Sequence, residues 1–256
     1  VSMPYSDVRT YYGRIFEGKF ISGAIAGAIS KNDHIGYIAS YPIFGVPAGI
    51  NAFALGAQLT NPDAKIHLKW SCVEGQPLAE LRDMGIEVVS TLDIPMPGWN
   101  EGQWGTFRMK PDGSTELIAS PYWNWGTFYV QFARGILGGN RDGRLFSKHE
   151  NRAINYWWGM SSGVVDLICS NKVPVETRRL VELFRKVICN NEFEPFSDEL
   201  YDQNRHLQNK KGHEMSPEDI ITMDWLLDNV VGDIPAIDEL DESARAIMVS
   251  QGITRE

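Results

Sequence analysis

A serine between two glycines stands in the segment from Gly159 to Gly163, which matches the G-x-S-x-G turn that exposes the nucleophile of many serine hydrolases. Such a serine needs an acid and a histidine further along the chain. The available partners crowd into one polar segment, and glycine and serine are also typical of any turn that ends a strand. We therefore predict that the chain is not an enzyme, and a serine hydrolase that uses Ser161 is the alternative. The candidate partners are Asp198 or Asp202 with His206 or His213.

Metal and phosphate chemistry has no support in the sequence. Glycine-rich phosphate loops, paired metal-binding histidines and calcium-loop spacing are absent, and the five histidines are dispersed. Cys72, Cys169 and Cys189 are odd in number and widely separated, so they indicate neither a disulfide framework nor a zinc ribbon. We expect no metal and no cofactor.

Aromatic residues gather in three groups that suit a flat ligand. Trp99 and Trp104 lie in one loop, residues 122–125 form a second group and residues 156–158 a third. Aromatic faces stack on planar bases or sugars, and a few amide or carboxylate groups then fix the orientation of the ligand. Core packing is the alternative role for each of these rings.

Hydrophobic spacing predicts the elements that would position these residues. Apolar residues recur at helical intervals over residues 15–29, and this stretch is too short and too charged, with Glu17 and Lys19, to span a membrane. Short apolar runs then alternate with helical stretches, which indicates a parallel sheet covered by helices on both faces. The runs cover residues 35–39, 65–70 and 86–91, and the helices cover residues 46–59 and 78–84.

Three candidate ligand residues lie near the carboxyl ends of these predicted strands. Trp70 ends the second strand, Asp93 stands just past the third, and Phe44 belongs to the loop after the first. Open α/β sheets bind their ligands at this edge. The alternative role of Asp93 is to cap a turn before Pro95.

Sequence patterns in the second half of the chain predict a hairpin and several helices. The turn at residues 111–114 separates two short strands, which form either an addition at the sheet edge or a flap near the site. Ser216, followed by a proline and two acids, predicts a helix start, and that helix should run to about Val230. The hairpin strands cover residues 106–110 and 115–119, the other helices residues 126–137, 176–189 and part of 238–251, and a further strand residues 154–158.

Composition and charge exclude some classes of partner. The 256 residues are 43% hydrophobic and 22% charged, which is typical of a globular protein. The formal net charge is -9, and lysine and arginine are scattered among acidic residues instead of forming a basic stripe. We therefore expect no nucleic acid partner.

Motifs along nearly the whole chain resemble those of the basic membrane lipoprotein (BMP) family of solute-binding proteins. The order and spacing of the motifs match, and the W-N-W-G motif resembles one branch of the family. The first set comprises Tyr12–Phe20, Gly23, Ala26–Ala28, Ile35–Ile38, Pro42–Ile43, Gly49–Phe53, Gly56–Ala57 and Asn61–Lys65; the second set comprises Trp123–Gly126, Tyr156–Met160, Gly163–Asp166, Met223–Leu226, Asn229–Gly232 and Ile234–Pro235.

The resemblance implies a type 1 periplasmic-binding-protein fold of class α/β, with two Rossmann-like lobes that close on a ligand. Members of this family bind nucleosides or, in the W-N-W-G branch, a purine base such as adenine, and they deliver it to an ABC transporter permease. The implied location is extracytoplasmic, as a lipoprotein or in the periplasm, although this sequence carries no secretion signal. A ligand-sensing surface protein without a transport role is an alternative, and we expect a monomer.

Compared with the family, about a hundred residues are missing before the first motif, so we expect most of the N-terminal lobe to be absent. Either the chain is a fragment or a processed product, or the missing N-terminal lobe is supplied separately as its partner. The expected division is a remnant of the first lobe and crossover at residues 1–34, a second Rossmann-like lobe with the hairpin at residues 35–165, and a helical return toward the hinge at residues 166–256.

The resemblance also implies roles for individual residues. Asp93 matches the family's strand-end aspartate, and Trp123 with Asn124 matches a segment that faces the cleft. We expect Asp93 to accept hydrogen bonds from a ring or exocyclic N–H and Trp70, Phe44 or Trp123 to stack on the base. This sequence departs from the family between residues 70 and 123, where a second tryptophan and a Gly-Tyr-x-x-Asp-like segment are replaced.

Overall fold

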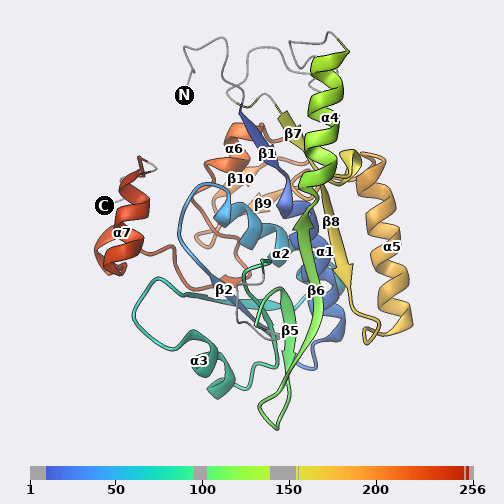
Figure 1. Cartoon of the computed structure of the whole chain (residues 1–256). Coiled ribbons are helices and arrows are strands. Elements are labelled where there is room, and N and C mark those ends of the chain that lie inside the picture. Colours follow the sequence, from blue (N-terminus) through green and yellow to red (C-terminus); the bar gives the residue numbers. More distant parts are fainter. Residues whose placement is uncertain (1–9, 95–102, 139–153, 155, 251, 254–256) are drawn as a thin grey trace.

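The computed structural model describes residues 10–94, 103–138, 154, 156–250 and 252–253, and a seven-stranded sheet forms its centre (Figure 1). The strand order is β11-β3-β2-β4-β5-β6-β8. The first four strands in this order run parallel, and β5, β6 and β8 each run antiparallel to the preceding strand. The strands are β2 (His34–Ala39), β3 (Lys65–Trp70), β4 (Val88–Ser90), β5 (Thr106–Met109), β6 (Thr115–Trp123), β8 (Val165–Cys169) and β11 (Val230–Val231).

Helices cover the two faces of this sheet, which confirms the predicted α/β class. Helices α1 (Ile15–Ile29) and α2 (Val46–Thr60) pack against each other, and α5 (Val175–Cys189) packs against α1. They share one large core with residues of β2, β3 and β8. Helix α3 (Pro77–Asp83) belongs to a second, smaller core, with Leu81 against Val89 and Phe107.

Close packing of α1 on α2 depends on glycines in both helices. A Cβ atom at Gly23 would collide with the backbone carbonyl of Phe53, and one at Gly56 would collide with that of Phe20. The two helix backbones therefore approach more closely than side chains would allow. This contact fixes the position of α1, whose first turns reach the carboxyl end of the sheet.

The predicted hairpin forms neither an addition at the sheet edge nor a flap near the site. Strands β5 and β6 lie inside the sheet, because β5 pairs with β4 and β6 pairs with β8. The edge position is taken by β8, so the hairpin is not an edge addition. Strand β6 also continues past the predicted end at residue 119 to Trp123, because β8 offers it a pairing partner along that length. Its end therefore reaches the same region as the loops after β2 and β4.

The helix predicted from Ser216 to about Val230 is wrong in its length. The start is confirmed, since Ser216 and Asp219 form a reciprocal cap, but α6 (Pro217–Ile221) spans little more than one turn. Beyond it, the buried Asn51 side chain donates to the Trp225 carbonyl at 2.9 Å and accepts from the Leu227 N–H at 3.0 Å. These bonds hold a non-helical backbone, which turns at residues 228–229 and then enters β11 at the sheet edge.

The remaining elements lie around this sheet (Figure 1). They include two small two-stranded sheets, one parallel between β1 and β7 and one antiparallel between β9 and β10. The last predicted helix is confirmed as α7. The elements are β1 (Tyr11–Gly13), α4 (Trp125–Leu137), β7 (Tyr156–Trp158), η1 (Met160–Ser162), β9 (Leu200–Tyr201), β10 (Leu207–Asn209), η2 (Ile237–Glu239) and α7 (Glu242–Ser250). The predicted loop tryptophan Trp99 lies outside the described residues, and the predicted domain division stays a prediction.

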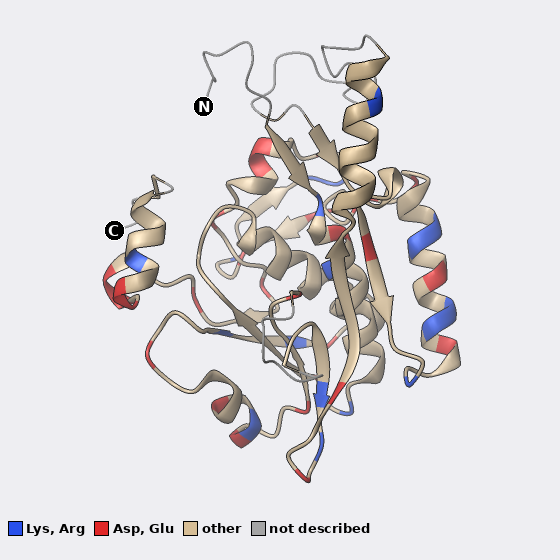
Figure 2. Ribbon diagram, viewed as in Figure 1, with Lys and Arg blue, Asp and Glu red and all other residues tan. Residues whose placement is uncertain are grey.

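Charged side chains are interspersed in sign, as Figure 2 shows for α5, where basic and acidic residues alternate along the helix. The three cysteines are free. Within the described part of the chain, no helix has the length and apolarity needed to cross a membrane.

Candidate functional site

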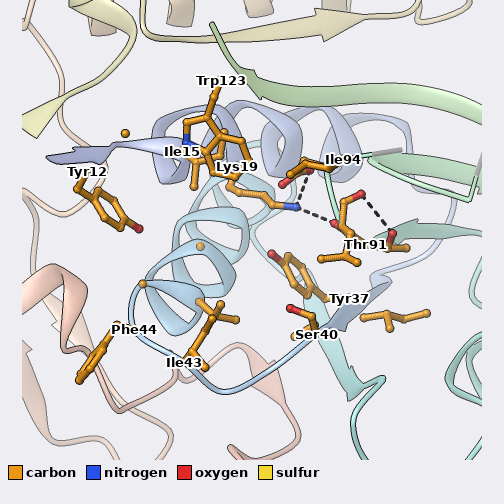
Figure 3. A pocket seen from close by; sticks show the side chains of 18 of the residues that line it. Tyr12, Ile15, Lys19, Tyr37, Ser40, Ile43, Phe44, Thr91, Ile94 and Trp123 are labelled. Carbon is orange, nitrogen blue, oxygen red and sulfur yellow. Dashed lines mark hydrogen bonds and ion pairs between the residues drawn. The ribbon is translucent and has the colours of Figure 1, made fainter. Parts of the chain in front are cut away.

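A cavity of about 500 Å³ opens at the carboxyl ends of β2 and β4 (Figure 3). The loops that follow these two strands, the first turns of α1 and α2, and the end of β6 supply its walls. Ligand pockets commonly have volumes of roughly 300–1,000 Å³ and occupy this edge of an α/β sheet. Lining residues include Tyr12, Lys19, Tyr37, Phe44, Asp93 and Trp123.

A left-handed glycine lets the chain turn from β2 into α2 at the cavity wall. Gly45 has φ 81° and precedes the first residue of α2. A Cβ atom there would also collide with the hydroxyl group of Tyr12. Any other residue would therefore strain the backbone and displace an aromatic side chain of the wall.

Aromatic rings form much of the cavity wall. Trp123 and Trp125 are stacked, with ring centroids 6.2 Å apart and an interplanar angle of 11°. Tyr12 stacks on Trp157 with a centroid distance of 5.2 Å. Phe44 stands on the loop after β2, and 46% of its surface is exposed. These rings present flat apolar surface to whatever occupies the cavity.

A buried ion pair provides the charge in this cavity. The Lys19 Nζ atom of α1 lies 2.8 Å from Asp93 Oδ1, and both side chains are less than 10% exposed, at 6% and 8%. The ammonium group also lies over the Tyr37 ring, 5.1 Å from its centroid. An unpaired charge is costly in an apolar environment, so burial favours the contact between Lys19 and Asp93.

The protonation of these groups follows from their burial and contacts. Burial acts to lower the pKa of Lys19, but its contacts with the Asp93 carboxylate and with Tyr37 outweigh this effect and raise the pKa above its usual value. Burial raises the pKa of Asp93, and Lys19 opposes this shift. Burial also raises the pKa of Tyr37, which therefore keeps its proton at neutral pH.

The structure brings three of the five predicted site residues to the cavity. Phe44, Asp93 and Trp123 line it. Trp70 belongs to the core, 7% exposed, and its indole N–H donates to the Asp233 carbonyl at 2.8 Å. Asn124 caps α4, because its side-chain oxygen accepts a bond from the backbone N–H of Thr127. Ligand contact by the five residues stays a prediction.

Several lining residues have no counterpart among the predicted ones, chiefly Lys19, Tyr37 and Tyr12. Lys19 carried a usable signal, since a charged residue in an otherwise apolar helix needs a buried partner. Tyr37 lies inside a strand, and the pattern of buried residues along a strand does not tell whether a side chain faces a cavity or the core. Burial raises the pKa of Tyr12 to about 12, so its hydroxyl group stays protonated.

The glycine–serine turn does not form a catalytic triad in the described structure. The hydroxyl group of Ser161 accepts a hydrogen bond from the Arg14 guanidinium at 3.2 Å. Of the predicted histidines, His206 contacts Asp202 at 3.2 Å and His213 contacts Asn209 at 3.1 Å. A cation beside Ser161 is not a base that would accept its proton.

One solved structure with a similar fold is that of a transcriptional activator of the comK gene from Bacillus halodurans. It superposes with a TM-score of 0.52 at 17% identity, and the alignment covers 73% of this chain and 66% of that one. At this identity the likeness concerns the fold alone.

Two curated relatives align over more of the chain. A purine-binding protein of Brucella abortus (strain 2308) is 27% identical over 243 residues, which are 90% of this chain and 66% of that protein. The putative ABC transporter glucose-binding protein TsgA13 of Haloferax volcanii is 30% identical over 167 residues, which are 60% of this chain and 40% of that protein. The chain thus spans less than two thirds of the length of each relative.

The family model of PnrA-like ABC transporter substrate-binding proteins matches residues 4–72. This segment contains β1, α1, β2, α2 and β3, and it supplies Tyr12, Lys19, Tyr37 and Phe44 to the cavity. The likeness to the purine-binding relative continues over most of the remaining chain. The family match therefore falls on the part of the fold that builds the cavity, and residues 4–72 are similar to PnrA-like ABC transporter substrate-binding proteins of the Bmp family.

Proposed function

We propose that this chain carries the ligand cavity of an extracytoplasmic substrate-binding protein, and that the cavity binds a purine base or a nucleoside for an ABC transporter permease. The observation that carries the proposal is a single buried carboxylate, Asp93, set in an aromatic cavity at the carboxyl edge of the sheet. The purine-binding relative supports the same ligand class.

The chemistry of the cavity favours a planar base over a hexose. A sugar carries hydroxyl groups around its whole rim, and each of them loses hydrogen bonds to water unless the protein replaces them. Among the described residues, the cavity is lined mainly by aromatic and aliphatic side chains, and the polar ones besides the tyrosines are Lys19, Ser40, Thr91 and Asp93. A base needs only a few polar contacts at its edge and apolar surface against its faces.

In this proposal Asp93 accepts a hydrogen bond from a ring or exocyclic N–H, and Trp123 or Phe44 stacks on the base. The side chains come from three separate segments, after β2, after β4 and at the end of β6, and Figure 3 labels Phe44 and Trp123 in different parts of the cavity lining. The tryptophan pair of Trp123 and Trp125 gives the stacking surface additional support.

Isothermal titration calorimetry on the full-length gene product tests the proposal. Adenine, guanine, hypoxanthine and adenosine are titrated in parallel with glucose. We expect at least one purine to bind, glucose not to bind, and Asp93→Ala to lower the purine affinity by about 10- to 100-fold, as for loss of a hydrogen bond to a charged group. The matched control is Asp83→Ala at the exposed end of α3, which should bind as the wild type does.

Two results would contradict the proposal. Glucose binding without purine binding would replace the ligand class. Unchanged purine affinity in folded Asp93→Ala would remove the aspartate from the site.

A further inference from the structure

The three protons of the Lys19 ammonium group are already used within the protein. Its Nζ atom lies 2.8 Å from Asp93 Oδ1, 2.9 Å from the Thr91 carbonyl oxygen and 3.4 Å from Ser90 Oγ. An ammonium group has three N–H donors and no acceptor. Lys19 therefore lines the cavity without a free donor for a ligand.

Asp93 is held on one side and left available on the other. Its Oδ1 atom accepts from Lys19, and its backbone carbonyl accepts from the Ser120 hydroxyl group at 3.2 Å. Within the described part of the chain, no donor reaches the second carboxylate oxygen, Oδ2. An ionised carboxylate only accepts hydrogen bonds, so a ligand at this position must present a donor.

The position of Lys19 is itself fixed by its surroundings. Tyr37 lies beneath its ammonium group, and Ser90 accepts a hydrogen bond from Thr106 at 3.1 Å while it faces Lys19. The α1 backbone on which Lys19 stands packs closely on α2 through Gly23. A side chain held in this way sets the orientation of its partner as well as its charge.

On the basis of the proposed function, we propose that Lys19 is a positioning residue that orients Asp93 and keeps it an acceptor, so that the cavity selects purines with an exocyclic amino group. In this proposal the exocyclic amino group, and not a ring N–H, is the donor to Asp93 Oδ2, whereas a carbonyl oxygen at the same place would face a negative charge. The selection thus comes from the ion pair and not from the shape of the cavity.

The pH dependence of binding gives a readout that separates this role from simple packing. Burial raises the pKa of Asp93 and Lys19 opposes the shift, so removal of Lys19 should raise this pKa further. A protonated Asp93 loses its charge and accepts more weakly. Purine affinity should therefore fall with decreasing pH, and in Lys19→Met the fall should begin at a higher pH than in the wild type.

Few other titratable groups face this pair. Among described residues, Tyr37 of β2 is the titratable neighbour that acts on both Lys19 and Asp93, and its raised pKa keeps it neutral. The neighbouring β4 and β6 contribute the uncharged Ser90 and Ser120, and α2 contributes Gly49. We therefore expect a shift in the acidic part of the binding–pH profile, its acid limb, to reflect the protonation of Asp93.

The test compares ligands and variants by calorimetry between about pH 5 and 8. The ligand pairs are adenine with unsubstituted purine, and guanine with hypoxanthine, because the members of each pair differ by one amino group. We expect a preference for the amino compound of about 10- to 100-fold in at least one pair. Affinities within threefold in both pairs would overturn the selection.

The variants then test whether Lys19 acts through Asp93. Lys19→Met should lower the affinity for the preferred amino compound by about 10-fold or more at pH 7.5 and move the acid limb to higher pH, whereas Lys19→Arg should restore both in large part. In the double variant with Asp93→Asn, loss of Lys19 should add little to the effect of Asp93→Asn alone. Wild-type affinity and pH profile in folded Lys19→Met, or additive effects, would overturn the role.

A matched control and a ligand-free measurement complete the design. Lys31→Met removes a lysine whose side chain is 74% exposed and should bind as the wild type does. If Lys19→Met does not fold, Lys19→Arg and Asp93→Asn still report the acid limb, which Asp93→Asn should abolish. If no purine binds, the proposed function fails, and carboxyl NMR titration of Asp93 in the wild type and Lys19→Met still tests the pairing. An Asp93 pKa that does not rise in Lys19→Met would overturn it.

Discussion

Replacement of Trp70 should damage the fold and leave the ligand cavity intact. This tryptophan ends β3 in the main core, is 7% exposed, and donates its indole N–H to the Asp233 carbonyl. A buried tryptophan covers about 150–250 Å², which corresponds to roughly 4–6 kcal/mol at about 25 cal/mol per Å² as an upper bound. Truncations of this kind cost about 3–5 kcal/mol in practice, so we expect Trp70→Ala to lose that much unfolding free energy.

Urea unfolding followed by circular dichroism measures this loss. With a slope of about 3 kcal/mol per molar urea, the midpoint should fall by roughly 1–1.7 M. Trp70→Phe keeps most of the volume and loses the N–H donor, so it should cost about 1–2 kcal/mol. Trp123→Ala is the opposite case, because Trp123 lines the cavity, and it should weaken purine binding with a smaller loss of stability. A Trp70→Ala protein that keeps the wild-type midpoint, or that is fully folded and fails to bind, would refute the reasoning.

Three further predictions concern packing, thiol reactivity and catalysis. Gly23→Ala should cost about 1–3 kcal/mol of unfolding free energy, because the added Cβ atom would collide with the Phe53 carbonyl. In the control Gly135→Ala, the added Cβ atom has nothing within 4 Å, so this change should be neutral or stabilising by up to about 1 kcal/mol. Equal urea midpoints for the two variants would contradict the close helix contact. Cys72 is buried and its pKa is raised to about 11, so iodoacetamide with mass spectrometry should label it only after denaturation, and labelling of native protein at pH 8 would show the site to be open. A fluorophosphonate probe should not label Ser161, and stoichiometric labelling would return the hydrolase to consideration.

Local pattern predicted most of the sheet and its covering helices. The helix over residues 15–29 and the strand over residues 65–70 have the predicted bounds, and the next helix starts at the predicted Val46. These elements have clear apolar periods and lie next to their partners in sequence. The end of the helix after Ser216 was missed because distant residues decide it, above all Asn51, whose amide group binds the backbone of residues 225 and 227.

The candidate site was only partly predictable for a similar reason. Asp93 and Phe44 follow strands, and the rule that ligands lie at the carboxyl edge of a sheet is enough to select them. The same rule selects Trp70, yet its side chain points into the core, which depends on the neighbouring C-terminal segment around Asp233. Lys19 lies on a helix far from these strands in sequence, so only the close packing of α1 reveals its partner.

The position of β11 has a consequence for the biosynthesis of the protein. Strand β3 is complete at Trp70, but among the described residues its outer edge is covered by Val230 and Val231, about 160 residues later. At roughly 5–20 residues per second, this edge stays open for about 10–30 seconds of translation. An uncovered strand edge is a template for pairing with other chains. The nascent chain therefore passes through an interval in which this edge of β3 is open to pairing with other chains.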